Sequence, residues 1–155
     1  MSRAFVKEQD GAEVDTDLPE LVVSPHRNLV TPEGLAHIED RLHRVRESVG
    51  EARASGDRAG IARHCRDLRY WEQRRASAEI VPPAAASGVV RFGSRVVLQP
   101  EHGSALVFRI VGEDEASPAD GRVSYVSPLA QAMIGGRVGD AIAFGDGEAE
   151  IVEIG

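Results

Sequence analysis

The sequence predicts an α+β protein in which an antiparallel hairpin of two long helices precedes a small antiparallel-sheet domain with one short helix. Apolar residues recur at spacings of three and four in two segments between residues 32 and 78, as in a helical seam. Short alternating or apolar runs, separated by Gly, Pro and Asp clusters, occupy residues 94–155. With 155 residues, the chain has room for a small domain plus an extended element.

Composition changes along the chain predict four regions. We assign residues 1–28 to a flexible acidic tail, because they combine acidic residues and two prolines with no sustained period, apart from a short docking stretch at 21–23. Residues 29–81 form the helical arm, and residues 82–88, within the Pro/Ala-rich "VPPAAASG", form a linker. Residues 89–155 form the C-terminal domain.

The first helix of the arm begins with a clear start signal. Thr31 suits the N-cap, Pro32 the first helical position, and Glu33 the positive end of the helix dipole. The apolar positions then alternate at the spacing of a coiled-coil seam, namely Leu35, Ile38, Leu42, Val45, Val49 and Ala52. A helix over 32–55 is roughly 36 Å long, so we expect it to project from the body of the protein as an arm.

The turn "ASGDRAG", residues 54–60, separates this helix from a second periodic segment. Its glycines, Ser and Asp supply turn chemistry. The second seam consists of Ile61, His64 or Cys65, Leu68, Trp71, Arg75 and Ala78. We expect Arg75 to lay its aliphatic stem along the seam.

The C-terminal region reads as about five strands and one helix. The strand candidates are "SRVVLQP", "ALVFRIVG", "GRVSYV", "DAIAFG" and "EAEIVEIG". The helix is "SPLAQAMIGG", with Ser127 as N-cap, Pro128 in the first turn and Gly135 as terminator. Such a helix would cover one face of the sheet.

Composition excludes several classes of function. A net charge of −7 argues against a protein drawn to duplex DNA by electrostatics, although the middle of the chain is near neutral and all its basic residues are arginines. The single cysteine excludes an internal disulfide framework and a multi-cysteine metal site. No apolar run approaches the roughly 20 residues of a membrane span, and the N-terminus lacks a signal-peptide stretch, so we expect a cytoplasmic protein without membrane contact.

Several motifs, in this order, resemble the Gre family of bacterial transcript-cleavage factors, GreA, GreB and their relatives. The strongest is "IVGEDEASPADGRVSYVSPLAQAMIGGRVGDAIAF", residues 110–144. "VRFGSRVVL" at 90–98 and "LVTPEGL" at 29–35 also match, and the opening "MSRAFVKE" is similar to tails of longer GreB-like members. The resemblance covers nearly the whole chain.

This resemblance implies an FKBP-like C-terminal domain that docks on RNA polymerase and an arm that enters the polymerase secondary channel. The docking residues it implies are Ser127, Pro128, Leu129, Met133 and Ile134. It further implies a monomeric accessory factor with no catalytic residues and no cofactor of its own, because any RNA cleavage would be catalysed by the polymerase. A shared Mg²⁺ in the polymerase active site would be the only metal involved.

The arm tip departs from the family pattern at an important position. Active factors carry a motif of the form G-D-x-x-E-N-A-[ED]-Y, whose two acids hold a catalytic Mg²⁺ of the polymerase. Gly56 and Asp57 match, but the second acid falls on Gly60, and Ile61 and His64 replace the Asn and the aromatic residue. Asp57 is therefore interpreted in three ways: as a turn residue or N-cap, as a Mg²⁺ ligand, or as a weaker electrostatic group in the active centre.

Arginines surround this tip. Arg58 adjoins Asp57, and the others are Arg53, Arg63, Arg66 and Arg69. They form either a solvated face or a contact surface for acidic or phosphate-bearing groups in the channel, including the nascent RNA 3′ end.

We therefore predict a regulator of transcription elongation with weak or no stimulation of transcript cleavage. One alternative is an active cleavage factor in which Asp57, helped by an acid such as Glu51, holds the second Mg²⁺. The other is a helical adaptor that acts independently of polymerase.

Overall fold

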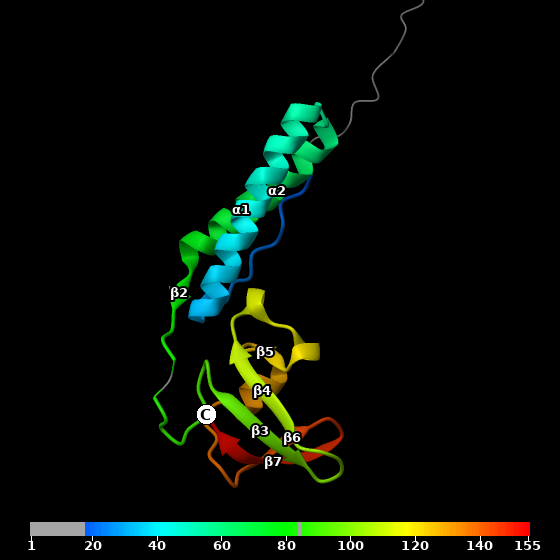
Figure 1. Cartoon of the computed structure of the whole chain (residues 1–155). Helices are drawn as coiled ribbons and strands as arrows, with labels where there is room; N and C mark the ends of the chain where they lie inside the picture. Colours follow the sequence, from blue (N-terminus) through cyan, green and yellow to red (C-terminus); the bar gives the residue numbers. More distant parts are fainter. Residues whose placement is uncertain (1–17, 84) are drawn as a thin grey trace, which may run out of the picture.

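The computed structural model describes residues 18–83 and 85–155. Figure 1 shows a long two-helix arm standing on a sheet domain, in agreement with the predicted α+β architecture. Within the described residues, no helix is long and apolar enough to cross a membrane. The predicted similarity of residues 1–8 to GreB-like tails, and most of the predicted flexible tail, lie outside the described residues.

The arm consists of helices α1 (Pro32–Ser55) and α2 (Arg58–Ser77), packed side by side and antiparallel. Thr31 caps α1 as predicted, because its side chain accepts a hydrogen bond from the amide of Gly34 at 2.9 Å. The α1 seam is confirmed, since Ile38, Leu42 and Val49 are all buried. Opposite it, Trp71 on α2 meets the ring of His37 edge-on, with 6.4 Å between ring centroids.

Two neighbouring arginines near the end of α2 differ sharply in exposure. Arg75 lies in an exposed ion pair with Glu39 of α1, with 2.8 Å between the Arg75 Nε and Glu39 Oε1 atoms. Its neighbour Arg74 is the buried residue, at 1% exposure. The expectation that the aliphatic stem of Arg75 follows the seam stays a prediction, although the pair with Glu39 shows that its guanidinium bridges the two helices at the surface.

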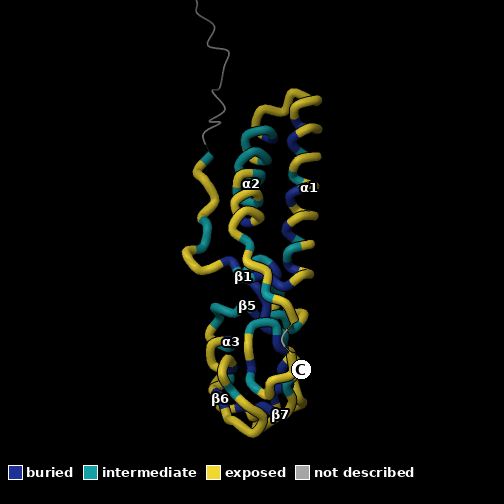
Figure 2. Tube along the Cα trace, turned by 90° about the vertical axis from the view of Figure 1, so that its left-hand side faces the viewer, coloured by how far each residue is buried: buried dark blue, intermediate teal, exposed yellow. Residues whose placement is uncertain are grey.

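Residues 18–28, called the N-terminal strap below, run down beside α2 toward the base of the arm (Figure 2). The chain then forms β1 (Leu29–Val30), which pairs in parallel with β2 (Glu79–Ile80) directly after α2. It reverses at Thr31 to enter α1. The strap and both helices therefore meet at the base of the arm.

The C-terminal domain contains the five strands expected from the sequence. They are β3 (Arg95–Pro100), β4 (Leu106–Val111), β5 (Arg122–Ser124), β6 (Ala141–Phe144) and β7 (Gly147–Ile154), in the spatial order β5-β4-β3-β7-β6. The predicted all-antiparallel sheet is wrong at one edge, because β5 runs parallel to β4. Residues 112–121, which include 3-10 turns at Glu113–Glu115 and Pro118–Asp120, are long enough to return the chain to the same end of the sheet.

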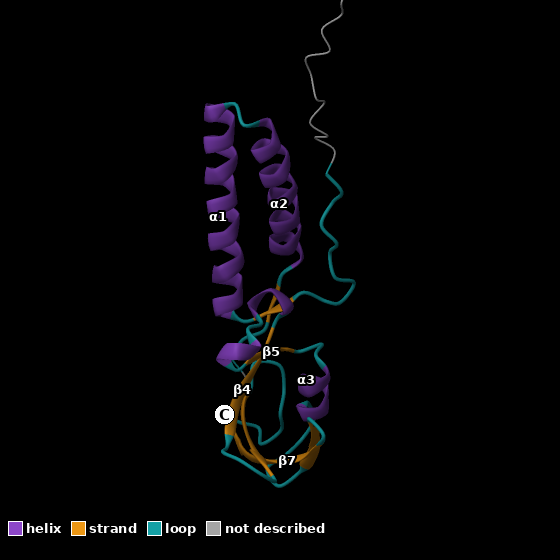
Figure 3. Ribbon diagram, turned by 90° about the vertical axis from the view of Figure 1, so that its right-hand side faces the viewer, coloured by secondary structure: helices purple, strands orange, loops and turns teal. Residues whose placement is uncertain are grey.

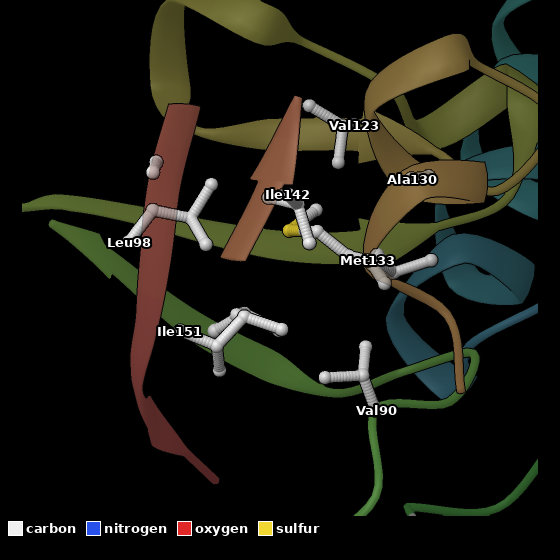
Figure 4. Close-up of a cluster of buried hydrophobic side chains, with 10 residues drawn as sticks. Val90, Leu98, Val123, Ala130, Met133, Ile142 and Ile151 are labelled. Carbon is white, nitrogen blue, oxygen red and sulfur yellow. The ribbon is translucent and has the colours of Figure 1, made fainter. Parts of the chain in front are cut away.

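Helix α3 (Pro128–Met133) covers one face of this sheet (Figure 3). Its N-cap is Ser127, as predicted, which accepts a hydrogen bond from the amide of Ala130 at 3.2 Å. Figure 4 shows the core between helix and strands. Its buried members are Val90, Val96, Leu98, Ile110, Val123, Ala130, Met133, Ile142, Ala149 and Ile151.

Candidate functional site

The tip of the arm is a tight turn between α1 and α2. Gly56 ends α1 in the left-handed conformation, with φ of 70°, which favours glycine. Asp57 follows as the N-cap of α2, and its Oδ1 atom accepts a hydrogen bond from the amide of Gly60 at 2.9 Å. Asp57 is exposed. The turn interpretation of this residue is therefore confirmed, and any further role must use a carboxylate already engaged by its own helix.

The glycine at position 60 determines where this carboxylate lies. Gly60 is buried, and a Cβ atom added to it would overlap the Asp57 carboxylate. The Asp57 side chain thus occupies the space that any larger residue at position 60 would need. A side chain at position 60 would push the carboxylate away from the helix end, toward solvent.

The tip by itself does not fit a metal ion. Asp57 supplies one carboxylate, and no group of three or more His, Cys, Asp or Glu side chains among the described residues is arranged to hold a metal ion. Glu51, the predicted helper acid, is exposed on α1 near the tip. A Mg²⁺ bound through Asp57 would need its other oxygen ligands from water and from another molecule.

The arginines around the tip divide into two sets. Arg66 pairs with Asp67 at 3.0 Å, and Arg69 pairs with Glu20 of the strap at 2.6 Å. The other three are exposed and have no ion pair within the described part of the chain, namely Arg53, Arg58 and Arg63. Only this second set leaves its charge free for another molecule at the tip.

The predicted docking residues around α3 are not equally accessible. Pro128 and Ile134 are exposed, with Ile134 at 37% exposure, while Ser127 and Leu129 are half-buried. Met133 is fully buried in the core. Met133 must therefore be removed from the docking set, because it faces the sheet and supports the helix from below.

The base of the arm holds a polar cluster around the buried Arg74, with half-buried Tyr70 and Asp114, that was not predicted from the sequence. The Arg74 guanidinium donates from Nε to Asp114 Oδ2, and the Tyr70 hydroxyl donates to Asp114 Oδ1 at 2.8 Å. Asp114 belongs to the turn after β4, so this contact joins the arm to the C-terminal domain. We call this group of Tyr70, Arg74 and Asp114 the base joint.

Burial in the base joint changes the ionisation of Tyr70. Desolvation first, and then the hydrogen bond to Asp114, raise the pKa of Tyr70 to about 12. The phenol therefore stays protonated over the physiological range and remains a hydrogen-bond donor to Asp114.

Two further contacts tie the start of α1 to the same domain. The Thr31 hydroxyl donates to Glu115 Oε2 at 2.6 Å, and Glu115 is buried. Gly34 leaves room for this acid, since a Cβ atom there would overlap the Glu115 carboxylate. Glu33 lies 3.5 Å from Arg109 of β4, and its own backbone amide, aided by Arg109, holds the pKa of its carboxyl below the ordinary value. The three consecutive acids of "GEDEA", Glu113, Asp114 and Glu115, therefore all face the base of the arm, and we call them the arm socket.

Comparison with known proteins agrees with this architecture. The family described as "Transcription elongation factor, GreA/GreB, C-term" matches residues 85–155. Transcription elongation factor GreA of Alkalilimnicola ehrlichii is 33% identical over 150 residues, which cover 81% of this chain and 95% of that protein. The chain belongs to the GreA/GreB family of transcription elongation factors. GreB of Yersinia pestis is 33% identical over 134 residues, covering 74% of this chain and 78% of that protein.

Among solved structures, the chain is similar to GreA factor homolog 1 (Gfh1) of Thermus thermophilus. The sequence identity is 24% and the TM-score is 0.40, with 84% of this chain and 99% of that chain covered. As a Gre-family elongation factor, this chain has the acids that hold the base of the arm, residues 113–115, within the segment 85–155 that the family matches. One signal of the base joint was present in the sequence, because Tyr70 and Arg74 stand four residues apart on a helix and so share one face.

Proposed function

We propose that this Gre-family factor binds RNA polymerase through its C-terminal domain, inserts its arm into the secondary channel, and modulates elongation without strongly stimulating transcript cleavage. It would compete with active Gre factors for the same channel. The factor has no catalytic residue of its own in this proposal.

The state of the Asp57 carboxylate carries the proposal. This carboxylate is folded onto the start of α2 and hydrogen-bonded to the Gly60 amide. The position that bears the second acid in active factors is Gly60, whose lack of a side chain makes room for that arrangement. To bind Mg²⁺, the Asp57 carboxylate must give up its hydrogen bond to the Gly60 amide, and no second acid is present to help it. Each missing charge-assisted contact weakens Mg²⁺ binding by about 1–3 kcal/mol.

The length of the arm and the exposed residues at its tip and around α3 support binding of RNA polymerase through two separate regions. α1 spans Pro32–Ser55, or about 36 Å at 1.5 Å per residue, so the tip stands well clear of the domain. In the C-terminal domain, Pro128 and Ile134 offer exposed apolar side chains at the two ends of α3. The exposed tip arginines, Arg53, Arg58 and Arg63, suit acidic or phosphate-bearing partners, with the nascent RNA 3′ end as one such group.

Backtracked elongation complexes test this function directly. We expect the protein to release few short 3′ RNA fragments by itself and, in excess, to reduce the fragments released by an active Gre factor. Robust release that Asp57→Ala abolishes would contradict the non-cleaving proposal. Absence of any polymerase binding would reject both Gre-type functions and favour a helical adaptor.

A repaired tip provides the sharper comparison. Gly60→Glu with Ile61→Asn restores the missing acid and Asn, and the new side chain must displace the Asp57 carboxylate outward. We expect RNA cleavage to rise at least tenfold over the wild type, which corresponds to about 1.4 kcal/mol in the barrier. The matched control is Gly60→Ala with Ile61→Asn, which displaces the same carboxylate without adding an acid. Equal cleavage by the two variants would show that freeing Asp57, and not the second acid, is what matters.

The cleavage-factor alternative keeps one observation in its favour. Asp57 is exposed in the turn that joins α1 to α2 at the end of the arm, where a ligand delivered into an active centre would have to be. If Asp57 acts alone as a metal ligand, wild-type cleavage should rise with Mg²⁺ concentration and vanish in Asp57→Asn. Under our proposal both proteins give the same low level.

A further inference from the structure

The N-terminal strap touches both the arm and the C-terminal domain. Arg69 of α2 donates to Glu20 from Nε at 2.9 Å and from Nη2 at 2.6 Å. Further along the strap, the Ser24 hydroxyl donates to Glu113 Oε1 at 3.0 Å, and the Tyr125 hydroxyl donates to the carbonyl of Arg27. The strap therefore crosses the junction with contacts on both sides (Figure 2).

Asn28 ends the strap and is buried, at 4% exposure. Its Nδ2 atom donates to the Arg74 carbonyl at 2.7 Å, one of the last carbonyls of α2 and so one in need of a partner from outside the helix. Its Oδ1 atom accepts from Arg74 Nη2 at 2.7 Å. One side chain thus caps the end of α2 and holds the guanidinium of Arg74.

The Arg74 guanidinium connects Asn28 with Asp114. Nη2 faces Asn28, while Nε donates to Asp114 of the C-terminal domain. Because a guanidinium is planar and its donors are fixed relative to one another, fixing one edge directs the other. Glu113 lies between the same groups, with one oxygen bound by Ser24 and the other buried without a hydrogen bond, 3.9 Å from Arg74 Nη2.

We infer that the N-terminal strap is a positioning element, in which Asn28 acts through Arg74, supported by Ser24 and Glu20, to fix the direction of the arm relative to the C-terminal domain. Small errors of direction matter in a long arm. A tilt of about 10° at the base moves the tip of a 36 Å helix by about 6 Å. The consequence for polymerase rests on the proposed function, whereas the fixed direction is a property of the free protein.

Single-molecule energy transfer in the free, full-length protein tests this inference. Cys65, the only cysteine, is replaced by serine, and dyes are attached at Ala54→Cys near the tip and Ser104→Cys in the β3–β4 loop, both at exposed positions. For this doubly labelled protein without further changes, we expect one narrow distribution of the distance between the two dyes. Asn28→Ala should broaden it or add a second population. His26→Ala is the matched control within the strap, because His26 is exposed and its side chain makes no hydrogen bond or ion pair with the described residues, and it should leave the distribution unchanged.

A surface variant keeps the test decisive if Asn28→Ala fails to fold. Ser24→Ala with Glu20→Gln removes the half-buried hydrogen bond to Glu113 and the charge of the exposed pair with Arg69, and it should broaden the distribution less, with unchanged helical circular dichroism. In elongation complexes, a variant whose arm is correctly directed in one molecule in ten should compete with an active Gre factor about tenfold more weakly.

The results separate this inference from the proposed function. Narrow, unchanged distributions in both strap variants would overturn the positioning role. Broadened distributions would support it even if the wild-type protein failed to bind polymerase, an outcome that would reject the proposed function alone.

Discussion

The tip and the base of the arm each place an aspartate against α2, with opposite results. Asp57 at the tip is exposed and is satisfied by an amide of its own helix. Asp114 at the base comes from another domain, and its side chain, at 10% exposure, is held by Tyr70 and Arg74. An acid satisfied locally and in water can be replaced or moved cheaply, whereas a buried acid shared between domains cannot. The tip is thus open to functional change, and the base is constrained.

Breaking the base joint should have the largest effect on the free energy of unfolding. Arg74→Ala removes the buried guanidinium that pairs with Asp114 and donates to Asn28 Oδ1, so we expect the free energy of unfolding to fall by about 3–5 kcal/mol. Arg75→Ala is the neighbouring control and should cost less than about 1 kcal/mol, because its pair with Glu39 is exposed. Chemical denaturation measures both, and equal losses would mean that Arg74 contributes no more than a surface charge.

The same joint should weaken in alkali. Because the folded state keeps the Tyr70 proton to a pKa of about 12, above the ordinary value of 10.0, unfolding releases a proton between those values. The stability contributed by Tyr70 is complete below pH 10 and is lost as the pH rises toward 12. Tyr70→Phe should cost about 1–2 kcal/mol at pH 8 through the lost hydrogen bond to Asp114.

The matching measurement is denaturant unfolding at several values between pH 8 and pH 11.5. We expect a flatter decline for Tyr70→Phe than for the wild type. Burial also raises the pKa of Tyr125, so a residual slope should remain in that variant. A slope identical to that of the wild type would exclude Tyr70 as the titrating group.

Changes at the tip should have the smallest effect on stability. Asp57→Ala removes the N-cap of α2 and should cost about 1 kcal/mol, whereas Asp57→Ser keeps a capping oxygen and should cost only a few tenths. Thermal unfolding checks both. Since Asp57→Ser removes the charge while keeping the cap, it also separates the two roles of this residue in the polymerase assay. A large loss of stability in the serine variant would show that the carboxylate charge, and not the cap, holds the turn.

The helix caps, the seam of α1 and the strands were predictable because their determinants are neighbours in the chain. The caps at Thr31 and Asp57, the seam of α1 and the five strands all follow from local spacing and turn chemistry. The parallel pairing of β4 with β5 does not, because it depends on how a long connection returns across the sheet. A run of apolar residues predicts a strand, but it does not tell whether the neighbouring strand runs parallel or antiparallel to it.

The contacts of the base joint could not be predicted, because their partners lie far apart in the chain. Arg74 is one of ten arginines between residues 32 and 80, and its burial depends on Asn28 and Asp114, which are 46 and 40 residues away. Met133 was assigned to the docking surface because the family resemblance implied docking for this region as a whole, and such a resemblance does not tell which residues of the region are buried against the sheet.

The order of these residues in the chain also has a consequence for synthesis. Asn28 and Arg74 leave the ribosome before Asp114, which follows Arg74 by 40 residues. At about 5–20 residues per second, the arm exists for about 2–8 seconds before its socket is made. The α1–α2 hairpin relies on local contacts and can form in that interval. Asn28 gives the Arg74 guanidinium and carbonyl a hydrogen-bond partner within the nascent arm. Arg74 therefore has a hydrogen-bond partner before the C-terminal domain has been synthesised.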